Sequence, residues 1–187
     1  MFEHFNTADQ VFHYKLGLAL TMEYDSLDML VEMEEAALRS DVRDLFRDHA
    51  HKSRQQIENL QQIFSLLGIE AHQAPSPASK GMAKEARSYI AKTDDAVLDG
   101  ALLAGGLELA HYETAVYDGL VIQAQAKGTA GIAELLHQNL GQEKAVIEDI
   151  KAAFESVATE DAAIQEESAA PDAPAIVIPP YLPPGSI

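Results

Sequence analysis

Residues 109–147 read LAHYETAVYDGLVIQAQAKGTAGIAELLHQNLGQEKAVI and contain two apolar patterns separated by Gly128. Within each half, leucine, isoleucine and valine recur every three or four residues, which is the period of an amphipathic helix. Glycine commonly follows the last residue of a helix, because it adopts the left-handed conformation without strain. Glu113 and Glu143 each lie fifteen residues from Gly128, so an antiparallel helical hairpin would bring these two side chains to the same level.

The rest of the chain extends this pattern to an all-α fold. Its 187 residues are 47% hydrophobic, which suffices for one core, and abundant alanine, leucine, glutamate and glutamine favour helices over strands. We expect long helices at about 8–38, 41–67, 95–127 and 130–156, and a short helix at about 80–91 after a proline-containing connector at 69–79. Short turns join the first two long helices and the last two, whereas about 25 residues separate the two pairs. Two antiparallel hairpins joined by one long crossover define a ferritin-like four-helix bundle.

Two helix starts carry residues suited to capping. Thr7 followed by Gln10 matches a capping box, in which two side chains satisfy free backbone N–H groups. Ser40 or Asp41 is expected to cap the second long helix, because short polar side chains accept hydrogen bonds from the first turn. The bundle is therefore assigned to residues 1–157.

Residues 158–187 differ in composition from the bundle. No lysine or arginine follows Lys151, and residues 158–175 are rich in alanine, glutamate, aspartate and proline, which predicts a disordered acidic linker. The apolar, proline-rich peptide AIVIPPYLPPGSI follows at 175–187. It is expected either to pack on its own bundle or a dimer mate, or to dock into a groove of a partner protein. This layout resembles that of encapsulin cargo proteins, which carry C-terminal loading peptides.

Charge and composition exclude several classes of function. The formal net charge of −17 argues against nucleic acid and anionic membranes as partners. With no cysteine, thiolate metal sites and thiol catalysis are excluded. The N-terminal residues lack the features of a signal peptide, and no apolar run approaches the roughly 20 residues of a membrane span. We therefore expect a cytoplasmic protein, either free or inside a protein compartment.

One polar side chain interrupts the apolar pattern near the middle of each long helix. These four residues are Glu23, His49, Glu113 and Glu143. Glu23 and His49 lie at similar distances from the first turn, as the two other glutamates do from Gly128, so all four are predicted to form one layer. An edge position that reaches solvent is the alternative for any single glutamate, because burying an unpaired carboxylate costs several kcal/mol.

Four inward polar groups at one level are typical of a carboxylate-bridged di-metal bundle. Such a site needs carboxylates and imidazoles, with ligand pairs at i and i+3 on two of the helices. The residues at the partner positions of His49 and Glu113 are Lys52 and Ala110, and neither ligates a metal. The ammonium of Lys52 is instead expected to lie among the glutamates and to supply the positive charge of a metal ion.

Several segments resemble the YciE/YciF family of ferritin-like bacterial stress proteins over about residues 8–157. They are Met22-Glu23, HAHKSRQQI from His49, AHYETAVY from Ala110 to Tyr117, and Gln142-Glu143-Lys144. The resemblance implies a homodimer with a di-iron or di-manganese site on the bundle axis. Glu23, His49, Glu113 and Glu143 match the family's ligands, whereas Lys52 and Ala110 replace two of its carboxylates.

Two functions remain open at this point. The first is a stress-response protein with a reduced iron or manganese site, whose chemistry would be metal redox with dioxygen or peroxide. The second is a metal-free bundle that acts as a binding or cargo module through its C-terminal peptide. Glu108 and His111 also have a ligand-like spacing, but they point away from Glu113 around the helix. Tyr112 and Tyr117 are expected to be packing residues.

Overall fold

The computed structural model describes residues 4–168, and the apolar peptide predicted at 175–187 lies outside this range. The described chain forms five helices, as the composition predicted. They are α1 (Ala8–Ala36), α2 (Ser40–Leu66), α3 (Pro77–Lys92), α4 (Asp95–Ala126) and α5 (Ala130–Ser168).

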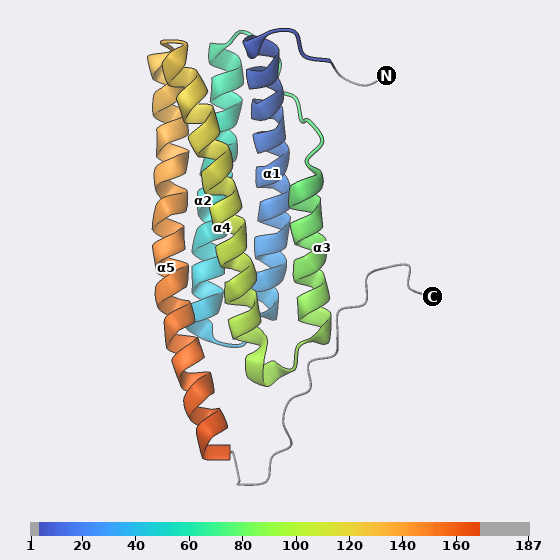
Figure 1. Cartoon of the computed structure of the whole chain (residues 1–187), viewed down its shortest axis with the longest axis vertical. Coiled ribbons are helices and arrows are strands. Elements are labelled where there is room, and N and C mark those ends of the chain that lie inside the picture. Colours follow the sequence, from blue (N-terminus) through green and yellow to red (C-terminus); the bar gives the residue numbers. More distant parts are fainter. Residues whose placement is uncertain (1–3, 169–187) are drawn as a thin grey trace, which may run out of the picture.

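The four long helices form a bundle of two antiparallel hairpins (Figure 1). Helices α1 and α2 make the first hairpin, and α4 and α5 make the second. The crossover between them returns along the bundle and includes α3, which packs against α1 and α4. This is the ferritin-like arrangement that the lengths of the connections predicted. No helix within residues 4–168 is long and apolar enough to cross a membrane.

Glycine ends both α2 and α4, as the sequence predicted. Gly68 and Gly128 have φ values of 67° and 71°, in the left-handed region that favours glycine. After each glycine the chain folds back onto the last turn, where Ile69 donates to the carbonyl of Phe64 and Thr129 to that of Ala124. These bonds satisfy carbonyl groups that a helix end otherwise leaves free.

The starts of α1 and α2 are capped differently. The Thr7 hydroxyl accepts from the Gln10 N–H at 3.2 Å, which confirms the cap by Thr7, whereas the Gln10 side chain accepts from the Asn6 N–H at 2.7 Å and not from that of Thr7 as in a capping box. The position predicted for the cap of α2 was wrong, because the N-cap residue is Arg39, which makes no side-chain cap bond, although Asp41 accepts from the Val42 N–H at 3.1 Å. Instead, Asp99 of α4 accepts hydrogen bonds from the N–H groups of Leu38 and Arg39 at 2.9 and 3.0 Å. This bond pair ties the two hairpins together at one end of the bundle.

The crossover lies directly against α1. Ala74 N–H donates to the carbonyl of Gly17, and its own carbonyl accepts from the Thr21 hydroxyl at 2.7 Å. A side chain at Gly17 would collide with the crossover segment, since an added Cβ would lie 3.0 Å from the His72 carbonyl oxygen. Helix α3 then begins with Pro77 in its first turn, a position where the missing N–H costs nothing.

Helix α5 continues twelve residues beyond the end predicted near Ser156, to Ser168. The sequence there is VATEDAAIQEES, whose alanine, glutamate and glutamine are good helix formers, and the first proline comes only at 171. Val157 is buried against the core, and Glu160 forms an ion pair with Arg39. The prediction of a disordered linker was therefore wrong for 158–168. The helix propensity of these residues prevails over their acidic composition.

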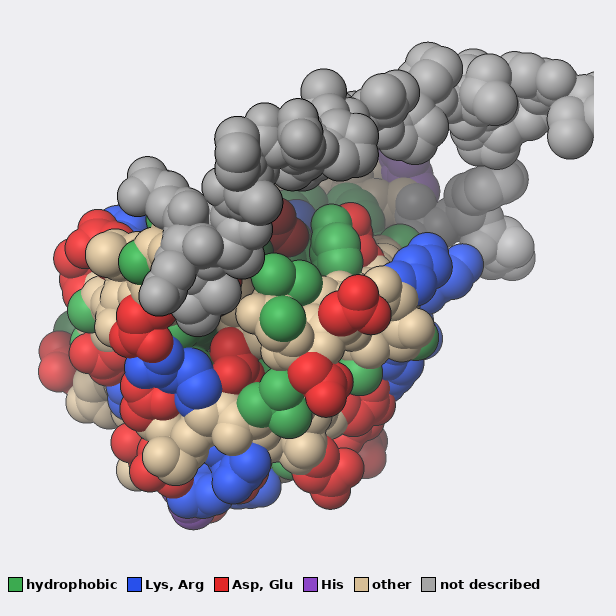
Figure 2. Space-filling view, turned by 90° about the horizontal axis from the view of Figure 1, so that it is seen from below, with side chains coloured by type: hydrophobic (Ala, Val, Ile, Leu, Met, Phe, Trp, Pro, Cys, Tyr) green, Lys and Arg blue, Asp and Glu red, His purple; other side chains and the backbone are tan. Residues whose placement is uncertain are grey.

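Two apolar clusters fill the interior of the bundle. One includes Phe12, Leu16, Leu60 and Leu136, near the end where α1 begins, and the other includes Met33, Phe46, Leu102 and Ile150. Leu27 packs against both clusters. The surface mixes charges of both signs with exposed apolar side chains, as seen from below in Figure 2. The predicted polar residues lie between the two clusters.

Candidate metal centre

The four predicted polar side chains are all buried in the bundle. Their exposed fractions are 1% for His49 and 0% for Glu23, Glu113 and Glu143. Each comes from a different long helix. Because all three glutamates are buried, the alternative in which a glutamate reaches solvent at the edge of its helix is wrong. The polar layer that was predicted from the spacing of these residues around the two turns is therefore present in the structure.

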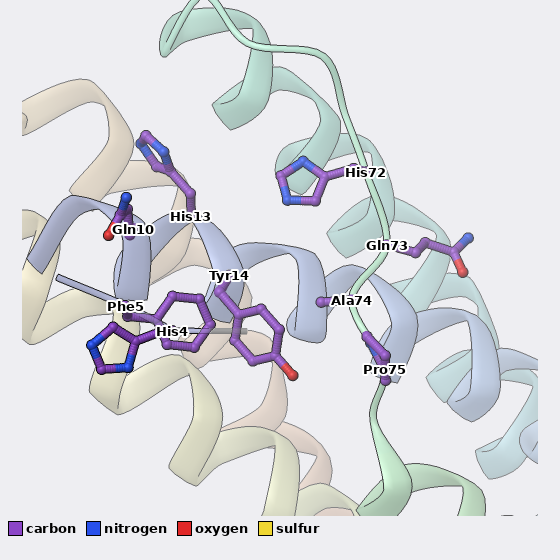
Figure 3. A pocket seen from close by; sticks show the side chains of 9 residues that line it. All are labelled: His4, Phe5, Gln10, His13, Tyr14, His72, Gln73, Ala74 and Pro75. Atoms are coloured by element: carbon purple, nitrogen blue, oxygen red, sulfur yellow. The ribbon is translucent and has the colours of Figure 1, made fainter. Parts of the chain in front are cut away.

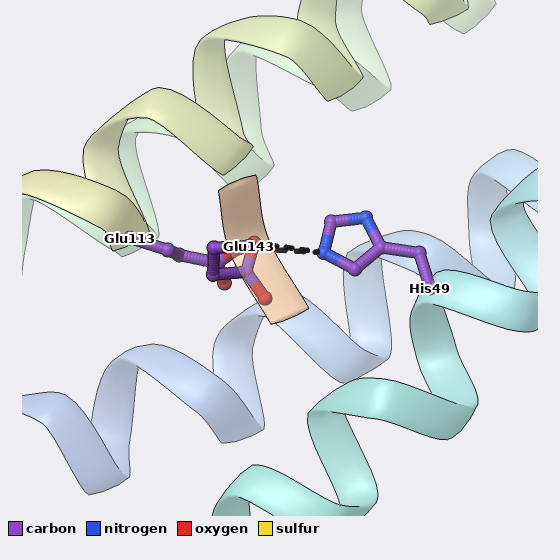
Figure 4. A group of neighbouring side chains, drawn as sticks. All are labelled: His49, Glu113 and Glu143. Carbon is purple, nitrogen blue, oxygen red and sulfur yellow. Dashed lines mark ion pairs between the residues drawn. The ribbon is translucent and has the colours of Figure 1, made fainter. Parts of the chain in front are cut away.

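Three of the four side chains meet closely (Figure 4). His49 Nε2 lies 3.4 Å from Glu113 Oε2 and 3.3 Å from Glu143 Oε2. One ligand atom from each of these residues lies within 4.8 Å of the others. Glu23 is not part of this close group, but the charges of Glu113 and Glu143 still act on its carboxyl group.

The imidazole of His49 supplies positive charge to the layer. Burial lowers the pKa of His49, but the neighbouring Glu113 and Glu143 outweigh that effect and raise the pKa to about 9. For Glu143, burial acts to raise the pKa. The ion pair with His49 and the hydrogen bond from Gln56 outweigh this effect and hold the pKa of Glu143 below its usual value. At neutral pH these two residues therefore form a buried ion pair.

The remaining glutamates are held in their protonated forms. Burial and the charge of Glu143 raise the pKa of Glu113 to about 8, against the opposing effect of His49. Burial and the nearby Glu113 and Glu143 raise the pKa of Glu23 well above its ordinary value. Without a metal, these shifts favour the protonated forms of Glu113 and Glu23 beside the pair of His49 and Glu143.

A network of hydrogen bonds orients two of the glutamates. Tyr117 donates its hydroxyl to Glu23 Oε1 at 2.6 Å, and Asn139 Nδ2 donates to the Tyr117 oxygen at 3.1 Å. Gln56 Nε2 donates to Glu143 Oε1 at 2.5 Å. The sequence interpretation treated Tyr117 as packing and missed Asn139. The sequence position of Asn139 could have indicated its role, because it lies four residues before Glu143 on the same face of α5.

Lys52 does not lie among the glutamates, which corrects the prediction. Its side chain is 28% exposed, and Nζ lies 3.6 Å from Asp149 Oδ2 of α5. One turn along α2 from His49, residue 52 is also rotated by about 60° around the helix, and a long lysine side chain extends readily toward water. His49 therefore takes the role expected of Lys52. Ala110 is buried and contributes only to packing.

The chemistry of the layer fits a metal cation. Its buried atoms without a hydrogen-bond partner among the described residues are Glu23 Oε2, both oxygens of Glu113, Glu143 Oε2 and both ring nitrogens of His49. Buried polar atoms are usually satisfied, so this concentration of polar atoms without hydrogen-bond partners is unusual. Carboxylate oxygens and imidazole are ligands of first-row transition metals.

Other candidate residues do not join this site. Glu108 and His111 are exposed on the outside of the bundle, as the helix geometry predicted, and His51 is exposed as well. A separate hollow near the N-terminal end of α1 is lined by His4, His13 and His72 (Figure 3). These rings point in different directions and do not form a metal-binding group like that of the buried layer.

Comparison with known proteins supports the fold and the family. The model of the DUF892 family, described as a domain of unknown function, matches residues 7–163. This chain belongs to the DUF892 family. It is 29% identical over 147 residues to protein YciF of Escherichia coli K12, a match that covers 78% of this chain and 87% of YciF. The predicted YciE/YciF relationship is therefore confirmed.

Solved structures of relatives have the same bundle. The crystal structure of the E. coli stress protein YciF matches with a TM-score of 0.79 and 25% identity, over 83% of this chain and 99% of YciF. YcfI of Rhodopseudomonas palustris, a proposed structural protein, matches with a TM-score of 0.77 and 29% identity, over 81% and 98% of the two chains. A protein of Xanthomonas campestris shares the fold at a TM-score of 0.70 and 19% identity, over 86% and 99%.

Proposed function

We propose that this DUF892 protein binds one iron or manganese ion in the polar layer and acts in a stress response that involves this metal. His49, Glu113 and Glu143 are the ligands, and Glu23 completes the set. The observation that carries the proposal is the convergence of ligand atoms of His49, Glu113 and Glu143 within 4.8 Å, several of them buried without a hydrogen-bond partner.

The surrounding residues would hold the ligands in place. Gln56 fixes one oxygen of Glu143 and leaves the other free. Tyr117 does the same for Glu23. The apolar clusters on either side keep bulk water out, which strengthens the attraction between carboxylates and a cation. When bound, iron or manganese would supply one-electron redox chemistry toward dioxygen or peroxide.

The two departures from the family's ligand pattern favour a single ion. Residues 52 and 110 lie at the positions from which the family resemblance implies two more carboxylates, and they supply a lysine and an alanine here. The remaining set of one imidazole and three carboxylates matches the ligands that one divalent cation needs, with water in the other positions. The homodimer implied by the resemblance stays a prediction.

One observation favours a second candidate, a metal-free bundle that acts through its surface. The imidazolium of His49 already neutralises Glu143 when no metal is present. A lysine at position 52 and an alanine at 110 are consistent with such a loss of metal. In that case, the function would reside in interactions with partners, including any made by residues 175–187.

Metal content separates the two candidates. Protein purified after growth with added iron or manganese should contain about one ion per chain, and a chelator should lower its melting temperature, because bound metal stabilises the folded state. His49→Gln should lose the ion. His51→Gln is the matched control, because this exposed histidine lies two residues away, and it should keep the ion. A metal-free wild type with an unchanged melting temperature would instead support the second candidate.

A further inference from the structure

An acidic groove runs over the outside of the buried layer, between α2 and α5. It has a volume of about 460 Å³ and is lined by four aspartates together with Leu45, His49, Lys52 and Val146. The aspartates are Asp41, Asp44 and Asp48 of α2 and Asp149 of α5. Since His49 is a proposed ligand, the floor of the groove touches the candidate metal centre.

Most of these aspartates already have cationic partners. Arg39 pairs with Asp41, and Arg47 pairs with Asp44. Lys52 pairs with Asp149 inside the groove. Asp48 forms no ion pair within residues 4–168, a range that contains every lysine and arginine of the chain. The groove lining therefore has an excess of negative charge, which Lys52 and His49 only partly offset.

His49 connects the groove to the buried layer. Its side chain is 1% exposed and lines the groove, while Nε2 faces Glu113 and Glu143. Neither ring nitrogen has a hydrogen-bond partner among the described residues. The buried His49 ring, with Nδ1 unpartnered, thus lies between the carboxylates of the groove and those of the buried layer.

We propose that this groove is an outer binding site for a hydrated divalent cation, which passes from Asp48 and Asp149 to His49 and the buried glutamates. The inference rests on the proposed metal-binding function. Lys52 has a defined role in this route, because its ammonium competes with the cation for Asp149. Displacement of Lys52 from Asp149 then accompanies uptake.

Removing aspartates from the groove and removing Lys52 should change the rate of cation exchange in opposite directions. Asp48→Asn with Asp149→Asn should slow both Co²⁺ uptake and chelator-driven loss about tenfold, because clefts lined by one sign of charge accelerate the passage of the opposite ion by this order. Lys52→Ala should accelerate both. The dissociation constant should stay within about twofold, since none of the proposed ligands changes, and 1 M salt should reduce the rate differences.

Stopped-flow absorption of Co²⁺ bound to the full chain tests this route, with equilibrium titration of each variant beside it. The chain offers a matched control, because Lys144 and Asp118 form a similar exposed pair at 3.5 Å away from the groove. Asp118→Asn and Lys144→Ala should leave the rates unchanged.

Slower exchange in the aspartate variant and faster exchange in Lys52→Ala, relative to these controls, would support the groove. Rates equal to those of the controls, with Co²⁺ still bound at one per chain, would overturn the groove but leave the metal centre intact. A wild type that binds no Co²⁺ at all would overturn the metal centre itself, and the groove with it.

Discussion

Tyr117 donates its hydroxyl to Glu23 at 2.6 Å, and both side chains are completely buried. They come from α4 and α1, so the bond joins the two hairpins at the polar layer. Asn139 of α5 donates to the same hydroxyl, which makes Tyr117 the centre of a three-helix contact. The candidate centre is thus organised by residues outside its own ligand set.

Replacing Tyr117 by phenylalanine should destabilise the protein by about 1–3 kcal/mol, because it leaves buried polar atoms of Glu23 and Asn139 without their partner. Urea unfolding measures this change. Tyr112→Phe is the control, since Tyr112 lies on the same helix but forms no side-chain hydrogen bond with a described residue. Equal effects of the two substitutions would show that the Tyr117 contact contributes nothing.

The metal-free protein should lose stability as pH rises from about 5 to 9. The pKa of Glu113 is raised from 4.5 to about 8 by folding, and that of His49 from 6.5 to about 9. Between each pair of values the folded protein binds more protons than the unfolded chain. The stabilisation is therefore complete at the lower pH and is lost as pH rises, by about 1.4 kcal/mol per pH unit for each such proton.

Urea unfolding in the presence of a chelator, repeated across this pH range, tests the titration. Glu113→Gln should flatten the decline between about pH 4.5 and 8, because the amide does not titrate. His51→Gln should leave the profile unchanged. If Glu113→Gln declines as steeply as the wild type, Glu113 does not titrate in the way the buried layer requires.

Gly106 tests the close approach of the Phe46 side chain to α4 in the core. An added Cβ would lie 2.8 Å from Phe46 Cε1, inside the core. Gly106→Ala should therefore destabilise by about 1–3 kcal/mol despite the better helix propensity of alanine. Gly119 of the same helix has nothing within 4 Å of an added Cβ, so Gly119→Ala should stabilise by up to about 1 kcal/mol. Thermal unfolding of both variants would reveal the expected opposite signs.

Restoring carboxylates at the two departing positions should increase metal capacity. Residue 52 lies in the groove that has His49 at its floor, and Ala110 is buried on the helix of Glu113. Lys52→Glu with Ala110→Glu should raise the iron or manganese content from about one to about two ions per chain, measured by elemental analysis. A variant that folds but gains no metal would contradict the placement of residues 52 and 110 beside the layer.

Much of the fold followed from local signals in the sequence. Gly128 and Gly68 mark helix ends because their backbone is left-handed, and equal spacing from Gly128 placed Glu113 and Glu143 at one level. The polar layer was predictable for the same reason, because helical rise is constant along a chain.

Other features depend on tertiary contacts that spacing does not contain. The capping of α2 by Asp99 comes from a residue sixty positions away. Lys52 was misplaced because its flexible side chain can reach either the layer or Asp149, and the sequence does not decide between these partners. Asn139 and Gln56 gain their roles only when α5 and α2 pack together.

The position of a bound metal is the most direct test of the proposed metal centre. Crystals of the wild-type protein grown with excess manganese or iron would be measured at the absorption edge of that metal, with His49→Gln as the comparison. One anomalous peak is expected beside His49 Nε2 and the carboxylates of Glu113 and Glu143, and it should be absent from the variant. An empty layer in the wild type, with His49 still paired to both glutamates, would contradict it.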